Sequence, residues 1–526
     1  MVVCTAFSFV FSATIGPCQT GGLPVGDAGW PGQDLFTNGV IRIEIKIAAQ
    51  DLERLRQNAR EFVRAEVTEG ATLYGDVAVH LKGSVGSFRP LDDKPGLTLD
   101  FARFRATQRF HGLRRVHLNN SVEDPSYCNE QIGGELFRAA GVPAPRVTRA
   151  LVMLNTRSLG LYVLKEAFTE DFLSCYFKKV GGNLYEPGEG HDVNQRLKKT
   201  SIQAPAQDRK ALKALAEAAL EPGLEQRWSR LEKVLELDRF IRFVALEVML
   251  CHRDGYSLAR NNFRVYQDLD TGKMVFFPHG MDQLFGSADL PWMPHMAGLV
   301  ARAVMETPEG KERYDHEFRS LLETVFNPES ITNRVDEIVS PLRSALGGSE
   351  FKEVQAQAGL VKDRIRERHR QLCRQLSPSQ IAPLAFTNGT GSLTSWNKAD
   401  IPNSGRMDQM TGPNGRACLH IQTFSEASPS WRTKAQLQGG HYRFEGRVRV
   451  SGAKPLGFGA HQGAALRIAG NTRQSQGLIG DSEWCLLAED FQVDPSGAEV
   501  EFICEFRASK GEAWFESDSL RVVQQP

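Results

Sequence analysis

The feature that most constrains the fold is a change of pattern around Pro378–Pro383. Before it, alternating strand-like runs are mixed with amphipathic helical runs, and after it short strand-like runs alternate with Gly, Ser and Thr turns. Mixed strands and helices predict an α+β domain, whereas short strands at regular turn spacing predict a β-sandwich. We therefore predict an α+β domain over residues 33–377 and an all-β sandwich over 384–526.

Length and charge exclude several classes of protein. At 526 residues the chain is too long for a single hydrophobic core. Lys+Arg and Asp+Glu both number 63 and no long basic run occurs, so nucleic acid is not an expected partner. Nine cysteines without a C-x-x-C pair predict neither a disulfide framework nor a zinc ribbon. Two readings of Cys485 and Cys504 stay open, a disulfide across strands or two unpaired thiols.

Residues 1–32 predict an apolar leader and a linker. The run around Phe7–Phe11 is apolar, but no Lys or Arg precedes it, so a leader with a truncated start is expected. We predict an exported protein at the cell surface or outside the cell, with a cytoplasmic tail as the alternative. No other apolar run is long enough to predict a membrane span.

Strand and helix signals follow one another through the first half of the chain. Period-two alternation predicts strands over 40–47, 75–84 and 96–101, and a hairpin of strands over 146–155 and 160–166. Helices are predicted from Asp51 to about residue 65 and from Tyr127 to Ala140. This region would be a strand-rich part, over about 33–180, followed by a helical part over about 181–377.

One stretch of the helical part contains polar residues of the types that bind metal ions. Residues 237–250 are apolar nearly all round and predict a buried helix that delivers Asp254 to a loop. A hairpin turning at Thr271-Gly272 then brings Asp282 back beside Asp254 and the pair Asn261-Asn262. Carboxylates and carboxamides are costly in a core but are the ligands that Mg2+ prefers. The stretch therefore predicts a site for a hard divalent cation.

These motifs resemble the CotH-type (spore coat protein H) atypical protein kinases. The resemblance is carried by Asp254-Gly255-Tyr256, Asn261-Asn262-Phe263 and Asp282…Phe285-Gly286. It implies a kinase-like bilobal domain that uses ATP and Mg2+ (or Mn2+) to phosphorylate Ser or Thr of a protein substrate. Asp254 would be the catalytic base or hydroxyl orienter, and Asn261 and Asp282 would bind metal, with Asn262 as the alternate. The chain departs from the pattern at Gly280, where the family has an acidic residue.

The same resemblance extends to a nucleotide-binding group in the strand-rich part. Ser84 lies in a glycine turn after Lys82, and Lys94 precedes the next strand. The backbone N–H groups of a glycine turn can bind a phosphate, and a lysine on the next strand neutralises the charge of that phosphate. Because Lys94 directly precedes this strand, it is the first choice for the phosphate lysine, and Lys82 is the second. The alternative is a surface hairpin with solvated lysines.

Two further assignments depend on topology. The strand that ends at Glu166 would be the hinge whose backbone faces adenine, or a plain core strand. Either Glu130 or Glu135 on the helix over 127–140 would pair with the phosphate lysine, or both would lie on a solvated face.

The closing run Gly511-Glu512-Ala513-Trp514-Phe515-Glu516…Leu520 resembles the last strands of jelly-roll carbohydrate-binding-type modules. Trp396, Trp431 and Trp484 would stack on a glycan, or would lie in the core of a spacer domain. Two alternatives to the kinase follow from the whole chain. One is a catalytically weak surface, coat-assembly or adhesion protein whose sandwich binds a glycan or a partner. The other is a metal-dependent hydrolase, although no H-E-x-x-H motif supports it.

Overall fold

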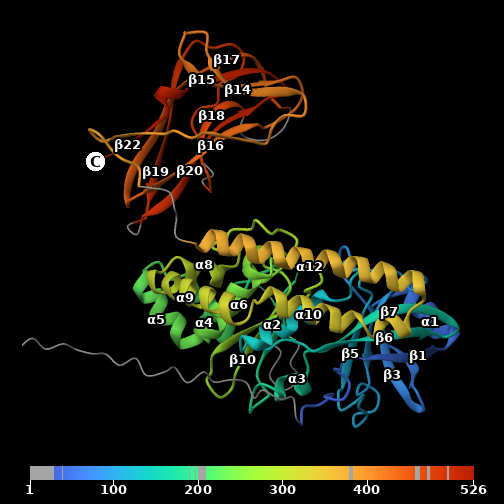
Figure 1. Cartoon of the computed structure of the whole chain (residues 1–526). Helices are drawn as coiled ribbons and strands as arrows, with labels where there is room; N and C mark the ends of the chain where they lie inside the picture. Colours follow the sequence, from blue (N-terminus) through green and yellow to red (C-terminus); the bar gives the residue numbers. More distant parts are fainter. Residues whose placement is uncertain are drawn as a thin grey trace, which may run out of the picture. The chain divides into compact units, whose positions relative to one another are not determined.

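The computed structural model describes residues 29–37, 39–188, 190–195, 197–199, 209–377, 383–456, 462–470, 474–494 and 497–525. The chain forms two compact units, which divide between Leu376 and Ser377. The first contains both strands and helices and the second is built from strands (Figure 1). Each unit is described by itself.

A closed barrel with strand order β1-β2-β3-β4-β5-β7-β6 opens the first unit. The parallel pairing of β1 with β6 closes it. Alternation in β1 buries Ile43, Ile45 and Ile47, which pack with apolar residues of the other strands in a core of their own. The strands are β1 (Val40–Ile47), β2 (Val63–Glu69), β3 (Thr72–Lys82), β4 (Gly96–Asp100), β5 (Arg115–Asn119), β6 (Val147–Leu154) and β7 (Arg157–Glu166).

Two helices accompany the barrel. Helix α1 (Ala49–Gln57) ends well before residue 65, so the prediction of a helix to that point was wrong. The reason is that Val63, Ala65 and Val67 alternate in burial and form β2 instead. Helix α2 (Asn129–Ala139) contacts β6, α6 and α10, so it lies between the barrel and the helical part.

The rest of the first unit is mainly helical and has its own core. Helix α6 is buried along most of its length, as its sequence predicts. A four-stranded sheet of order β11-β10-β8-β9 flanks it, made of β8 (Leu184–Glu186), β9 (Lys198–Lys199), β10 (Phe263–Gln267) and β11 (Met274–Pro278). The helices are α3 (Glu170–Ser174), α4 (Lys210–Ala219), α5 (Leu224–Val234), α6 (Leu237–Met249), α7 (Tyr256–Ala259), α8 (Leu299–Met305), α9 (Pro308–Thr324), α10 (Pro328–Val339), α11 (Leu342–Ala345) and α12 (Gly348–Leu376).

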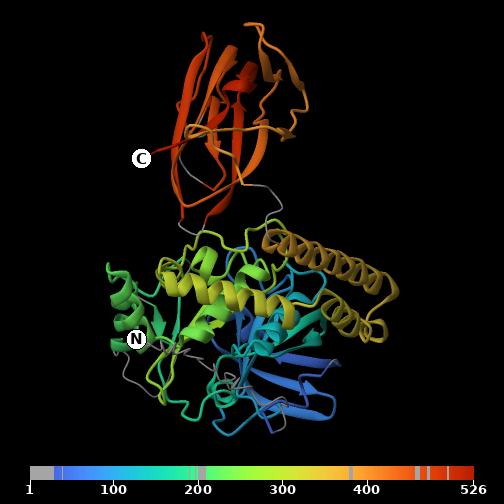
Figure 2. The ribbon, with the colours of Figure 1, turned by 60° about the vertical axis from the view of Figure 1, so that its left-hand side comes forward.

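Helix α12 spans the length of the first unit. Figure 2 shows the barrel in blue beside the green and yellow helices, and α12 runs along this unit in Figure 1. Near its first turn, Glu350 lies close to Gly160 of the barrel strand β7. Near its last turns, the buried Arg368 donates to the carbonyls of Val248 and Met249 at the end of α6. It therefore braces the point at which the chain leaves α6.

The second unit is a β-sandwich. One sheet has the order β12-β22-β17-β21-β15-β14, with β19 paired to β17, and the other has the order β13-β16-β20-β18. Apolar residues of both sheets share one core, among them Ile421, Phe515 and Phe502. The strands are β12 (Thr390–Ser392), β13 (Asn397–Ala399), β14 (Gly405–Thr411), β15 (Ala417–Thr423), β16 (Ser430–Leu437), β17 (Gly440–Lys454), β18 (Gly463–Ile468), β19 (Cys485–Val493), β20 (Ala498–Arg507), β21 (Lys510–Glu516) and β22 (Arg521–Gln524).

Two predictions about side chains of the sandwich are resolved. Cys485 and Cys504 are both unpaired, because β19 and β20 belong to different sheets, so the disulfide reading was wrong. Trp396 and Trp431 are buried in the shared core, whereas Trp484 is half-buried. The first two therefore support packing and not sugar stacking.

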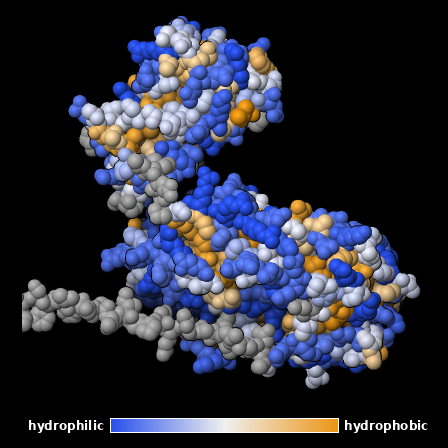
Figure 3. Space-filling model, viewed as in Figure 1, coloured by the Kyte–Doolittle hydropathy of each residue, from blue (hydrophilic) through white to orange (hydrophobic). Residues whose placement is uncertain are grey.

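The surface drawn in Figure 3 is mostly hydrophilic, with scattered hydrophobic patches. Within the described ranges, none of the helices combines the length and the apolar character needed to cross a bilayer.

Candidate functional site

The loop that follows α6 gathers three of the predicted site residues. Asp254 is exposed, and Asn261 Nδ2 lies 3.0 and 3.1 Å from its two carboxylate oxygens. Asn262 Nδ2 donates to Asp254 Oδ2 at 2.5 Å. Both carboxamides turn their N–H groups to Asp254, which leaves their oxygens as acceptors. The structure thus brings Asp254, Asn261 and Asn262 together.

The hairpin of β10 and β11 brings the segment that leads to Asp282 against Asn262. Phe263 pairs with Pro278, and the N–H of His279 donates to the carbonyl of Asn262 at 2.9 Å. A Cβ added at Gly280 would lie 2.4 Å from Asn262 Oδ1. The chain therefore needs glycine here, with its φ of 54°, for Asn262 to approach the segment that carries Asp282.

Two side chains of helix α2 hold the backbone of Met281 and Asp282. Asn129 Nδ2 donates to the carbonyl of Asp282 at 2.7 Å, and Glu130 Oε1 accepts from the N–H of Met281 at 3.1 Å. Burial first, and then the charges of Glu130 and Glu123, raise the pKa of Asp282 to about 7, and the charge of Lys165 opposes this rise. A carboxylate in such a place favours a bound cation, because a cation would offset the cost of its charge.

A buried ion pair links this segment to the barrel. Lys165 Nζ of β7 lies 2.7 Å from Glu130 Oε2 and 3.3 Å from His279 Nδ1. Glu130 is thus one of the two glutamates predicted to pair with a lysine, but its partner is neither Lys94 nor Lys82. Glu135 instead pairs with Arg334 at 2.7 Å. A lysine inside a buried stretch of strand, here residues 161–166, needs a carboxylate partner, and the apolar residues around Lys165 made this signal available in the sequence.

The structure places Lys82, and not Lys94, beside this group. Burial first, and then the charge of Lys165, lower the pKa of Lys82 to about 8, and the charges of Glu130 and Asp282 oppose this change. Its Nζ contacts Asn119 Oδ1. This placement favours Lys82 over Lys94 as the phosphate lysine, and the assignment itself stays a prediction.

Lys94 lies among aromatic rings instead. Its Nζ donates to the Tyr127 hydroxyl at 2.8 Å and lies 5.2 Å from the ring centres of Tyr127 and Tyr162. Burial lowers its pKa to about 8, and the nearby charges that oppose this are Glu350 and Asp93. Its nearest charged groups thus belong to α12 and its own loop.

Ser84 stands at the tip of an exposed turn between β3 and β4. Gly83 has a φ of 117°, and the Ser84 N–H donates to Ser87 Oγ at 3.2 Å. Asn120 Nδ2 donates to the carbonyls of Ser87 and Lys94, which anchors the turn. The predicted contact between Ser84 and a phosphate remains a prediction.

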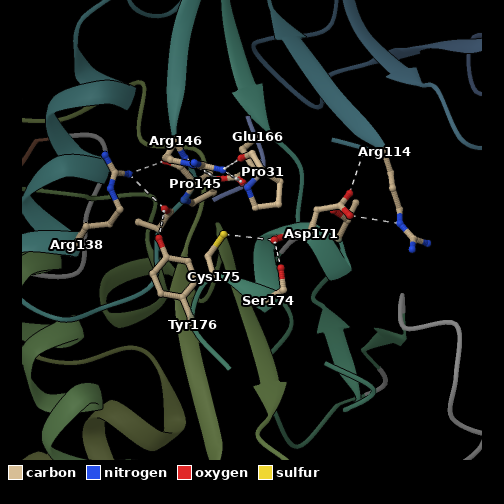
Figure 4. Close-up of polar contacts among 12 residues, drawn as sticks. Pro31, Arg114, Arg138, Pro145, Arg146, Glu166, Asp171, Ser174, Cys175 and Tyr176 are labelled. Atoms are coloured by element: carbon tan, nitrogen blue, oxygen red, sulfur yellow. Dashed lines mark hydrogen bonds and ion pairs between the residues drawn. The ribbon is translucent and has the colours of Figure 1, made fainter. Parts of the chain in front are cut away.

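Glu166 cannot serve a nucleotide with its side chain. Its carboxylate is buried and accepts from Arg146 Nη2 at 2.6 Å and from Arg146 Nε at 3.1 Å (Figure 4). Its backbone N–H donates to the carbonyl of Arg146 at 2.9 Å. The carboxylate is thus fully occupied by a buried partner, and the predicted contact of adenine with the backbone at this strand end remains a prediction.

The donor set suits a hard cation. Asp282 and the carboxamide oxygens of Asn261 and Asn262 are all oxygen ligands of the kind that Mg2+ takes, often completed by phosphate and water. Among the residues that the structure describes, no cluster of three or more His, Cys, Asp or Glu is placed to hold a metal. The residues therefore fit a Mg2+ or Mn2+ ion shared with a phosphate better than a zinc ion held by the protein alone.

Comparison with known proteins places the site in a family context. The family model described as "CotH kinase protein" matches residues 79–373, which is more than half of the chain. Invasin CotH2 of Rhizopus delemar is 23% identical over 253 residues, which cover 41% of this chain and 42% of the invasin. Inner spore coat protein H of Bacillus subtilis is 22% identical over 252 residues, which cover 44% of this chain and 68% of that protein. The chain thus spans about two fifths of the invasin's length.

Solved structures match the chain over about a quarter of its length. One is TmCBM61 in complex with β-1,4-galactotriose, with a TM-score of 0.20 and 13% identity, covering 27% of this chain and 100% of that one. Another is titled "CBM4 structure and function", with a TM-score of 0.19 and 14% identity, covering 25% and 86%.

Proposed function

The chain belongs to the CotH kinase protein family, and from this premise we propose that it transfers the γ-phosphate of ATP to Ser or Thr of a protein. The observation that carries the proposal is the meeting of two loops. Asp254, Asn261 and Asn262 lie together, and Asn262 abuts the segment that presents Asp282. Barrel and helical part would act as the two lobes of a kinase-like domain.

Each residue has a role that its surroundings support. Asp254 is exposed and would orient the acceptor hydroxyl or accept its proton. Asp282, with Asn262 or Asn261, would hold Mg2+ or Mn2+, which would offset the charge of the phosphates. Lys82 lies close enough to Asp282 and Glu130 for their charges to act on it, and it would neutralise phosphate. Catalysis would consist of positioning and charge stabilisation.

A second function is a coat or surface protein with weak catalysis. It is favoured by the names of the relatives, one an invasin and another an inner spore coat protein. In this case the first unit is a scaffold and the sandwich binds a glycan or a partner. Both functions are compatible with a location outside the cell or at its surface.

One experiment separates the two functions. Purified protein is incubated with Mn2+ and labelled ATP, as wild type, Asp254→Ala, Asp282→Ala and the control Asp363→Ala, which changes an exposed residue of α12. We expect protein-bound label in the wild type and the control, and its loss in the two site variants. Thermal stabilisation by Mn2+ and ATP without label transfer would instead favour the scaffold.

A further inference from the structure

Glu247 of α6 is a fully buried carboxylate that the proposed roles leave unused. Its Oε1 accepts from the N–H of Tyr256 at 2.9 Å, and its Oε2 accepts from the N–H and Oγ of Ser257 at 2.7 and 2.5 Å. Its exposed fraction is 0%. A buried carboxylate costs free energy unless several donors satisfy it, so a position needed only for packing would carry an apolar residue.

The Glu247 carboxylate leaves no room for a side chain at Gly255, the residue after Asp254. A Cβ added at Gly255 would lie 2.5 Å from Glu247 Oε1 and 2.8 Å from His252 Cδ2. The φ of Gly255 is −81°, so its backbone does not require glycine. Close approach of Glu247 is therefore what excludes a side chain between Asp254 and Tyr256.

The same loop is held from a second side. The Tyr256 hydroxyl donates to Asp192 Oδ1 at 3.0 Å and accepts from the N–H of Val300 at 2.9 Å. Asp192 Oδ2 accepts from the N–H of Leu299 at 2.7 Å. The side chain of Tyr256 is thus anchored by Asp192, and its backbone by Glu247.

We propose that Glu247 is a positioning residue, whose carboxylate holds the amides of Tyr256 and Ser257 and thereby fixes the orientation of Asp254. Its effect on phosphoryl transfer depends on the proposed function, but its effect on the loop does not. Burial raises the pKa of Glu247 to about 7, while the hydrogen bonds from Ser257 and Tyr256 oppose this rise and stabilise the carboxylate.

Amide hydrogen exchange tests the structural step without any need for activity. The variants are Glu247→Gln and the milder Ser257→Ala, and the control is Glu516→Gln, which alters a buried carboxylate of the sandwich. We expect exchange at Tyr256 and Ser257 to become about tenfold faster or more in Glu247→Gln, because hydrogen bonds to a charged acceptor are among the strongest. Ser257→Ala should give a smaller increase and Glu516→Gln none. Exchange within about twofold of wild type in both loop variants would overturn the proposal, and Ser257→Ala decides it if Glu247→Gln does not fold.

Kinetics test the catalytic step. If the wild type transfers phosphate, Glu247→Gln should lower kcat about tenfold or more and leave the KM for ATP within about twofold, because Asp254 acts on the acceptor and not on ATP binding. An unchanged kcat, or a rise in KM alone, would contradict the role. A wild type that transfers no phosphate would refute the proposed function, and hydrogen exchange would still decide whether Glu247 holds the loop.

Discussion

The ammonium of Lys165 lies 2.7 Å from the carboxylate of Glu130, and both side chains are almost completely buried. The pair joins the barrel strand β7 to helix α2, and the other oxygen of Glu130 accepts from the N–H of Met281. One carboxylate therefore ties the barrel to the segment that presents Asp282. The proposed phosphoryl transfer would need the phosphate-binding and metal-binding groups to be held in a fixed relation, and this contact fixes the segment that presents Asp282 against the barrel.

Breaking this pair should be costly. We expect Glu130→Gln or Lys165→Met to lower the free energy of unfolding of the first unit by about 3–5 kcal/mol, because each leaves a buried charge without its partner. Urea unfolding checks this. The double variant Lys165→Met with Glu130→Leu should recover part of the loss. Single variants as stable as the wild type would show that the pair contributes nothing to the fold.

Gly280 should not tolerate alanine. Gly280→Ala places a Cβ against Asn262 at a positive φ, whereas the matched control Gly272→Ala has a φ of 74° and meets no atom within 4 Å. We expect the control to lose about 1 kcal/mol from backbone strain alone, and Gly280→Ala to lose more. Gly280→Ala should also abolish the rise in Tm caused by Mn2+ with ATP. An equal loss in the two variants would mean that the Asn262 contact has no role.

Lys82 and Lys94 should differ in their effect on nucleotide binding. We expect Lys82→Met to weaken binding of ATP with Mn2+ about tenfold or more, as for the loss of one charge-assisted contact, and Lys94→Met to change it less than about twofold. Isothermal titration calorimetry measures both. The opposite order would restore Lys94 as the phosphate lysine.

Stability should depend on pH through His111. Its Nε2 lies 2.7 Å from Glu69 Oε2 and its Nδ1 2.5 Å from Asp34 Oδ2. Desolvation lowers the pKa of His111, but the hydrogen bonds to Asp34 and Glu69 outweigh this, and the pKa is raised. The charged form is thus favoured by folding, so its contribution is complete below the unfolded pKa of about 6.5 and is lost as pH rises through the folded pKa.

The His111→Asn variant isolates this contribution. Asparagine accepts the φ of 49° at this position but carries no charge. The difference in Tm between wild type and His111→Asn should be largest near pH 6 and should shrink above the folded pKa. A difference that grows with pH would contradict the sign of the shift.

Local sequence signals predicted much of the architecture. Alternation in 40–47 placed β1, the apolar run 237–250 placed α6, and the turn at Thr271-Gly272 placed the hairpin that returns Asp282 to Asn262. Short-range patterns succeed here because each records which face of a single element is buried. The same reasoning failed after Gln57, where a polar stretch continued the helical pattern although the chain turns to form β2.

By itself, the sequence determined the polar residues of the two site loops and the hairpin that joins them, because their geometry follows from helix, turn and strand pairing near in the chain. Only the tertiary structure decided that Glu166 pairs with Arg146 and that Lys165 pairs with Glu130. It also decided that the charge of Asp282 acts on Lys82, whereas the nearby charges at Lys94 are those of Glu350 and Asp93. The physical reason is that a buried charge pairs with a group that is close in space but distant in the sequence. The two contacts of Glu130 join residues 35 and 151 positions apart, and closure of the barrel against α2 sets which charges meet.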